Sequence, residues 1–192
     1  MQTEVSNLCA IRSGITLRKK GDEPTENHPG PYMLRIKDID GLEISPDYSH
    51  PINLAGKLER YIIAAGDVAF SSRGTHCRAG VMPEHDRPYI APSQLYILTP
   101  NDPDGLLPHY LALVLSSEYA ENYFRKRRKG SRVQIITKNS LSDLPVTVPP
   151  LEAQQRLISL HLLIEQETQL QHGIIAKRKI QFEQSIKLSQ AS

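Results

Sequence analysis

Short apolar stretches with a two-residue alternation run through residues 32–100 and predict β-strands. The stretch YMLRIKDI has the period of a half-buried strand, with apolar positions that include Ile36 and Ile39. GLEIS follows directly after Asp40-Gly41, a pair that favours a tight hairpin turn. Further strands are predicted on both sides of Gly66-Asp67 in RYIIAAGDVAFSSRG, and in AGVM, SQLYILT, RVQIIT and LPVTV. Such a series of short strands and turns predicts mixed or antiparallel sheet.

The pattern changes to a helical period near Pro108. Proline suits the first position of a helix, because its missing N–H would have no partner there. Apolar residues then recur at spacings of three and four, which predicts one helix with a buried face. These residues are Tyr110, Leu111, Val114, Leu115, Tyr119 and Tyr123.

A second, much longer helical pattern follows Pro149-Pro150 and runs from Leu151 to about Ile186. At 1.5 Å per residue it would span roughly 54 Å, more than a domain of this size can cover. We therefore predict a coiled-coil-like pairing with a partner helix. The alternative is an intramolecular hairpin that folds back at Gly173. The apolar positions expected to meet the partner include Leu157, Leu160, Ile164, Leu170, Ile174, Phe182 and Ile186.

The two patterns predict an α+β protein with two parts. Residues 1–148 would form a globular domain, and residues 149–192 a helical region. The chain of 192 residues is 39% hydrophobic, which suffices for a core. It has no apolar run of 18 residues and no signal-peptide pattern at its N-terminus, so we expect a cytoplasmic protein without a membrane span.

Composition excludes several kinds of site. Two cysteines, Cys9 and Cys77, are too few for a disulfide framework or a four-cysteine metal site. The adjacent His76 and Cys77 lack the further ligands that zinc needs, so no metal site is predicted. The sequence contains no Gly-rich phosphate loop, no G-x-S-x-G elbow and no metal-nuclease arrangement. Asp67 follows a glycine and fits a turn-capping role. No catalytic residue is therefore predicted.

The formal net charge of +2 says little about binding partners, but the positions of the charged residues along the chain are informative. The segment FRKRRKGSRVQIITK carries seven cations and no acid. Clustered Lys and Arg neutralise DNA phosphates, while Arg and Gln have the geometry to recognise base edges in the major groove. A basic run is more often a solvated surface, but this one spans a helix end, a turn and a strand. The candidate DNA contacts are Lys126, Arg127, Arg128, Lys129, Ser131, Arg132, Gln134 and Lys138.

A second polar loop, SSRGTHCRAG, follows a predicted strand. Its two glycines permit a close approach of the backbone to a ligand. Four side chains of this loop are able to contact bases or phosphates, namely Arg73, Thr75, His76 and Arg78. Both segments together predict a protein that binds double-stranded DNA.

Four pieces of the sequence, in order, resemble the specificity subunit of type I restriction–modification systems. They are PYMLRIKDIDG, AAGDVAFSSRG, the turn and strand in KGSRVQIITK, and the junction NSLSDLPVTVPPLEAQQRL that leads into the long helix. The resemblance covers about Tyr32 to Gln184. Ala153 stands where an acidic residue is commoner in the family, a change of little physical consequence.

The resemblance implies a target-recognition domain over residues 1–148 and a helix that acts as spacer and as docking surface for a methyltransferase (modification) subunit. Family members usually carry two recognition domains and paired helices, so this sequence resembles a half-length form. It would work as a homodimer on a split, palindromic target. The chain itself would bind no cofactor, while S-adenosylmethionine, Mg²⁺ and ATP would bind to partner subunits.

Two alternatives stay open at this point. One is a stand-alone DNA-binding protein of antiphage defence that uses the same fold without a methyltransferase. The other is a pure interaction protein, in which the helix assembles an oligomer and the basic cluster is only solvated.

Overall fold

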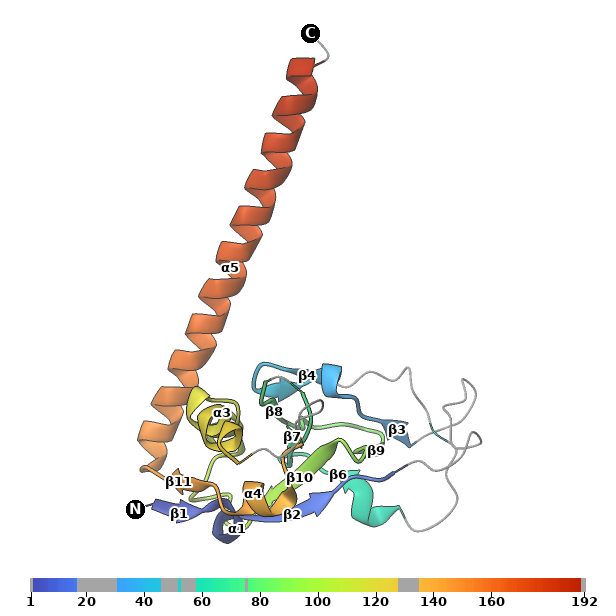
Figure 1. Cartoon of the computed structure of the whole chain (residues 1–192), viewed down its shortest axis with the longest axis vertical. Coiled ribbons are helices and arrows are strands. Elements are labelled where there is room, and N and C mark those ends of the chain that lie inside the picture. Colours follow the sequence, from blue (N-terminus) through green and yellow to red (C-terminus); the bar gives the residue numbers. More distant parts are fainter. Residues whose placement is uncertain are drawn as a thin grey trace. The chain divides into compact units, whose positions relative to one another are not determined.

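The computed structural model describes residues 2–16, 31–45, 52, 58–74, 76–127 and 135–190. It divides into two compact units, Met1–Gln155 and Arg156–Ser192. The first unit combines sheets with short helices, and the second consists of helix alone, which confirms the predicted α+β class (Figure 1). No helix within these ranges is long and apolar enough to cross a membrane.

The centre of the first unit is a six-stranded sheet in the order β2-β10-β7-β8-β5-β4. All neighbouring strands are antiparallel except β5 and β8, which are parallel. Strand β7 is buried along its whole length, which explains its apolar sequence VAFS. The strands are β2 (Cys9–Ser13), β4 (Ile39–Asp40), β5 (Glu43–Ile44), β7 (Val68–Ser71), β8 (Ala79–Val81) and β10 (Leu95–Pro100).

The predicted hairpin at Asp40-Gly41 is confirmed, because Ile39 pairs with Ile44 and Asp40 with Glu43. Gly41 has φ of 58°, a conformation that glycine adopts without steric cost. The single strand predicted over YMLRIKDI is wrong, however. This stretch forms β3 (Tyr32–Met33), a 3₁₀ turn η2 (Ile36–Asp38) and then β4. The Asp38 carboxylate accepts a hydrogen bond from the Arg35 backbone at 2.8 Å and stabilises this turn.

Strand β3 belongs to a separate three-stranded sheet in the order β3-β9-β6, with β6 (Ile62–Ile63) and β9 (Tyr89–Ile90). A 3₁₀ turn, η3 (Glu59–Tyr61), leads into β6. The two strands predicted around Gly66-Asp67 are confirmed as β6 and β7, but each pairs in a different sheet. One apolar cluster with residues from both sheets, including Ile63, Ile97 and Tyr89, forms the core.

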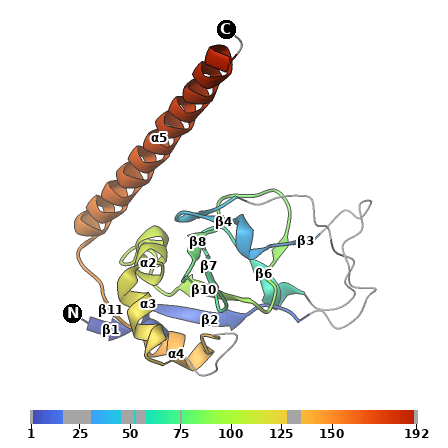
Figure 2. The same ribbon diagram turned by 45° about the horizontal axis from the view of Figure 1, so that its top comes forward.

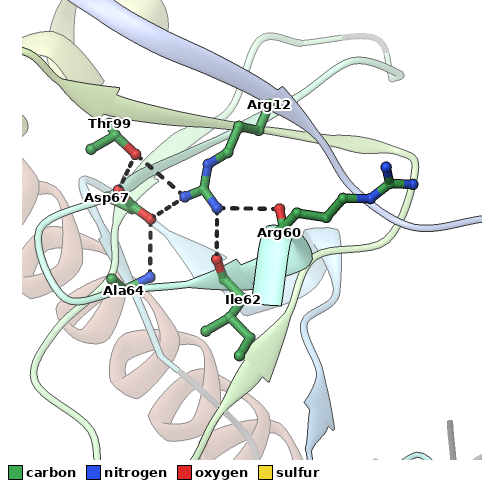
Figure 3. A network of polar contacts seen from close by, with 6 residues as sticks. All are labelled: Arg12, Arg60, Ile62, Ala64, Asp67 and Thr99. Atoms are coloured by element: carbon green, nitrogen blue, oxygen red, sulfur yellow. Dashed lines mark hydrogen bonds and ion pairs between the residues drawn. The ribbon is translucent and has the colours of Figure 1, made fainter. Parts of the chain in front are cut away.

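A polar network joins the two sheets around Arg12 of β2 (Figure 3). The Arg12 guanidinium donates to Asp67 Oδ2 at 2.8 Å, and to the carbonyl oxygens of Arg60 and Ile62 at 3.2 and 3.1 Å. Asp67 also accepts from Thr99 Oγ1 at 2.6 Å and from the backbone N–H of Ala64 at 3.0 Å. The last bond confirms the predicted turn-capping role of Asp67.

Helical segments cover one end of the large sheet, where α2 (Pro108–Leu115) packs against β7 and β8 (Figure 2). The single helix predicted from Pro108 to Tyr123 is wrong, because a second helix, α3 (Glu118–Arg125), starts after a break. Ser117 causes the break, since its hydroxyl accepts from Ala120 N as an N-cap. Phe124 of α3 packs its ring on Phe70 of β7, with centroids 5.7 Å apart.

The N-terminal segment forms structure that the sequence pattern did not predict. Strand β1 (Gln2–Glu4) pairs with β11 (Pro145–Thr147), which confirms the strand predicted in LPVTV, and a one-turn helix α1 (Val5–Leu8) leads into β2. A short helix α4 (Lys138–Ser142) precedes β11 and is capped by Thr137. The first half of the predicted strand RVQIIT, residues 132–134, lies outside the described residues. In its second half, Ile135 forms an isolated antiparallel bridge to Arg73.

The long helix is confirmed as α5 (Leu151–Gln190), which runs without interruption through Gly173 (Figure 1). The alternative of a hairpin at Gly173 is therefore wrong. A Cβ atom added at Gly173 would meet nothing within 4 Å, so no packing within the described chain explains this glycine.

Candidate nucleic-acid interface

The loop between β7 and β8, residues 72–78, presents three of the four side chains predicted to contact DNA. Arg73, His76 and Arg78 are exposed, whereas Cys77 between the last two is buried at 5% exposure. Thr75 lies outside the described residues. The buried thiol directs its two neighbours outward, because a side chain that points into the core leaves the adjacent ones on the other side of an extended backbone.

Side chains from the α2–α3 region hold this loop at its second half. The Glu121 carboxylate accepts from the backbone N–H of Cys77 at 3.2 Å and lies 3.2 Å from Nδ1 of His76. The Ser116 hydroxyl accepts from the backbone N–H of Ala79 at 2.9 Å, where β8 begins. These bonds hold the backbone of the loop in place, so that its exposed side chains point away from the core.

The first half of the loop is anchored by two serine hydroxyls. Ser71 Oγ donates to the carbonyl oxygen of Arg73 at 2.5 Å, and Ser72 Oγ donates to that of Gln94 at 2.9 Å. Gly74 has φ of 128°, a backbone conformation that side chains rarely adopt. The glycine therefore permits the turn that separates Arg73 from His76.

The same loop pairs with the end of the basic segment, which is 60 residues away in the sequence. The backbone N–H of Ile136 donates to Ser72 O at 2.9 Å, beside the bridge between Arg73 and Ile135. The Tyr96 hydroxyl donates to Ile136 O at 3.1 Å, so both polar groups of the Ile136 backbone are bonded. The structure thus brings together the two segments that the sequence singled out independently.

The hydroxyl of Tyr96 reports the charges around this junction. Burial raises the pKa of Tyr96 above its ordinary value, while a hydrogen bond from the Lys138 backbone and the positive charge of Arg73 lower it. Arg73 and the backbone of Lys138, one from each predicted segment, therefore both lie near the Tyr96 hydroxyl. Lys138 is exposed, as expected for a side chain that contacts phosphate.

The C-terminal end of α3 supplies further exposed cations next to the Phe70–Phe124 contact. Arg125, Lys126 and Arg127 are all exposed, and the Arg127 guanidinium lies 3.7 Å from the centroid of the Tyr123 ring. The other predicted contacts of the basic segment, Arg128, Lys129, Ser131, Arg132 and Gln134, lie outside the described residues. We refer to the β7–β8 loop, residues 135–138 and the end of α3 as the basic surface.

Sequence reasoning missed the residues that position this surface. Glu121, Tyr96 and Ser116 carry no motif and stand in ordinary helix and strand patterns, so no signal in one sequence distinguishes them. Arg125 was the one detectable omission, since it belongs to the same run of cations as Lys126.

The junction with α5 is built around a buried amide. Gln154 is fully buried, and its Oε1 accepts from Leu107 N at 2.9 Å. Its Nε2 donates to the carbonyl oxygens of Gly105 and Pro149, at 2.9 and 2.8 Å. All partners are backbone atoms from the loop before α2 and from the Pro149-Pro150 step. The first turn of α5 is thereby fixed to the first unit.

Beyond this junction α5 exposes its large apolar side chains. Their exposed fractions range from 40% at Ile186 to 69% at Leu170. The predicted partner-facing residues Leu157, Leu160, Ile164, Leu170, Ile174, Phe182 and Ile186 are all in this exposed set. Exposure of this extent on one helix is typical of a surface that another chain covers.

Within the described ranges, no group of three or more His, Cys, Asp or Glu side chains is placed to hold a metal ion. The two cysteines are free and buried, and His76 lies beside the Glu121 carboxylate, which makes a pair and not a group of three. The arrangement presents cations and hydrogen-bond donors on an outer surface, which suits binding of a polyanion.

Comparisons with known proteins give a family and a fold for this chain. A family model described as the type I restriction modification DNA specificity domain matches residues 2–177. No curated protein sequence matches the chain.

Solved structures show the same fold. The HsdS subunit from Thermoanaerobacter tengcongensis is 22% identical, with a TM-score of 0.60 over 87% of this chain and 37% of that one. A chain from a structure of the assembly and conformational transition of the type I R-M system is 20% identical, with a TM-score of 0.61 and coverages of 87% and 38%. The type I restriction-modification S subunit from M. genitalium is 16% identical, with a TM-score of 0.50 and coverages of 86% and 39%.

Proposed function

Because this chain belongs to the type I restriction modification DNA specificity domain family, we propose that it is a non-catalytic subunit that selects a DNA sequence for a partner adenine methyltransferase. The observation that carries the proposal is the joining of two cation-bearing segments at the contact of Ser72 with Ile136. Cations held on an anchored backbone are suited both to neutralise phosphates and to read base edges.

The chain spans less than two fifths of the length of the solved chains that it matches. We propose that two copies of this chain assemble through α5. The exposed apolar residues of α5 support this proposal, because pairing would remove them from water.

The charges along α5 favour an antiparallel pair. Glu165 and Glu167 precede the middle of the helix, and Lys177, Arg178 and Lys179 follow it. In a parallel pair, equal charges would lie side by side. In an antiparallel pair, the acidic part of one helix faces the basic part of the other, so that carboxylates of one chain lie opposite cations of its partner and attract them.

A homodimer with a two-fold axis places two identical recognition domains on the DNA. Its target is then two inverted copies of one short sequence, separated by a spacer that α5 measures. The methyltransferase and restriction subunits would bring S-adenosylmethionine, Mg²⁺ and ATP, and this chain would bind none of them.

The test is to co-express the chain with a type I methyltransferase subunit and to map methylated adenines across the host genome. We expect methylation at one split, palindromic sequence, and no methylation from either protein alone. Methylation at an asymmetric or continuous sequence would contradict the homodimer.

DNA binding by the purified chain without any methyltransferase distinguishes the alternatives. Sequence-selective binding with no detectable association with the methyltransferase would favour a stand-alone protein of antiphage defence. Failure to bind any duplex, even at low salt, would identify α5-mediated assembly as the main role and would refute the proposed function.

A further inference from the structure

Glu121 is an acidic side chain within the basic surface. It lies on α3, one turn before the exposed cations Arg125, Lys126 and Arg127. Its side chain is only 21% exposed, and its Oε1 atom is directed at the β7–β8 loop. A negative charge at this position opposes the binding of phosphates that the surrounding cations favour.

Among the residues that the structure describes, the hydrogen-bonding partners of the Glu121 side chain are two consecutive residues of the loop. Oε1 accepts from the backbone N–H of Cys77 and lies beside the imidazole of His76, both at 3.2 Å. Since the Cys77 side chain is buried, this backbone position is held from both sides, by the core and by the carboxylate. The exposed neighbours His76 and Arg78 are consequently fixed in direction.

The negative charge of Glu121 and its hold on the loop affect different kinds of contact with DNA. Loop fixation favours contacts that need a defined direction, such as hydrogen bonds to base edges. Negative charge weakens contacts that need only a cation, such as those with phosphate. The charge lowers the affinity for every duplex, whereas loop fixation adds affinity for the target alone and so increases the difference between the target and other sequences.

We propose that Glu121 is a specificity-determining positioning residue, which orients His76 and Arg78 toward base edges and lowers the affinity of the basic surface for DNA of unrelated sequence. The inference rests on the proposed function, because it requires that the basic surface bind duplex DNA.

Two substitutions of Glu121 separate its charge from its hydrogen bond. Glu121→Gln removes the charge but keeps an oxygen that accepts from Cys77 N, whereas Glu121→Ala removes both. The probes are a random-sequence duplex and duplexes that the wild-type chain selects from a random pool, with affinities measured across a range of salt concentrations.

We expect Glu121→Gln to bind both duplexes about three- to tenfold more tightly at low salt, because both present phosphates and the loop contact with Cys77 N is kept. Glu121→Ala should show the same gain on random DNA and lose roughly tenfold affinity for the selected duplex, because the loop is released. A purely structural role would not strengthen binding to random DNA.

Glu118→Gln is the matched control, because it removes an equal charge from the exposed first turn of the same helix. We expect it to change affinity for the random duplex less than twofold. A double-mutant cycle of Glu121→Ala with His76→Ala should show that the two losses on the selected duplex are not additive.

Equal behaviour of Glu121→Gln and Glu118→Gln would overturn the inference, as would wild-type discrimination by Glu121→Ala. Both results presuppose a wild-type chain that discriminates between the two duplexes. A wild-type chain that binds both duplexes equally, or neither, would instead refute the proposed function itself.

Discussion

Cys9 lies on β2 with its thiol in the core, where it is 3% exposed. Burial raises the pKa of this thiol from 9.0 to about 12. A buried thiol resists ionisation, because the thiolate would lose its hydration without gaining a partner. The unfolded chain has no such restriction, so the thiol titrates at a lower pH when the protein unfolds.

The sign of the resulting pH dependence follows from the direction of the shift. The native-state pKa is the higher one, so the unfolded state releases a proton first and the stability falls as the pH rises above 9.0. Between pH 8 and pH 10 this group alone should lower the free energy of unfolding by about 1.4 kcal/mol.

Urea unfolding of the wild type and of Cys9→Ala at both pH values checks this prediction. The alanine variant starts from a lower stability because of the cavity, but its further loss between pH 8 and pH 10 should be smaller by about 1.4 kcal/mol. Identical losses in the two proteins would show that the thiol does not titrate as expected.

Gln154 gives a second prediction for a single residue, because its amide serves three backbone groups in the protein interior. Gln154→Leu keeps the apolar volume but leaves Leu107 N and two carbonyl oxygens without this partner. We expect a loss of about 2–3 kcal/mol in the free energy of unfolding. The exposed neighbour in Gln155→Leu serves as control and should change the stability by less than about 0.5 kcal/mol. Equal effects in chemical denaturation would contradict the structural role of Gln154.

The elements of the chain divide into those that local sequence determines and those that depend on distant contacts. The β4–β5 hairpin, the strands β7, β8 and β10 and the helix α5 were predictable, since turn residues and apolar periodicity act locally. Strand β9 and helices α1 and α4 have two to five residues each, too few to show a period. The pairing of β1 with β11 joins segments about 140 residues apart, and no local pattern encodes it.

The candidate site also combines features that the sequence shows with features that depend on tertiary packing. Its cations were predictable from the sequence, because clustered Arg and Lys are visible without a structure. The contact of Ser72 with Ile136, and the position of Glu121 beneath the loop, follow from tertiary packing alone. The assignment of individual side chains to DNA contacts stays a prediction.

The predicted contacts of the basic segment, residues 124–138, should play separate roles in DNA binding. Lys126 at the end of α3 is a candidate phosphate contact, while Arg132 and Gln134 are candidate base contacts. Lys126→Ala should weaken binding to all duplexes alike and reduce the slope of log affinity against log salt by about 1. Arg132→Ala or Gln134→Ala should cost about 1–3 kcal/mol on the target only. Salt titrations on target and random duplexes would refute this assignment if all three variants behaved identically.

At the scale of the whole molecule, assembly depends on α5. Leu170 is 69% exposed in the single chain and lies between the acidic and basic parts of the helix. In the proposed dimer it would face the partner helix, where a carboxylate is costly unless paired. Leu170→Asp should therefore weaken dimerisation roughly 100-fold, which corresponds to about 2.7 kcal/mol.

Light scattering and sedimentation at several concentrations measure this change. The control is Gln169→Asp, which adds the same charge at an exposed polar position one residue earlier. It should leave the dimer intact. A wild-type chain that is monomeric at all concentrations, or equal effects of the two substitutions, would contradict pairing through Leu170.

The anchoring of the β7–β8 loop has a consequence for how new DNA targets arise. Ser72, Ile136 and Cys77 are held through backbone atoms, so the bonds do not depend on which side chains occupy positions 73, 76 and 78. Arg73, His76 and Arg78 are exposed and fill no space in the core. Under the proposed function, point changes at these positions would therefore alter the recognised sequence at little cost in stability. Such a chain is able to acquire a new specificity in single steps, with a folded protein at each of them.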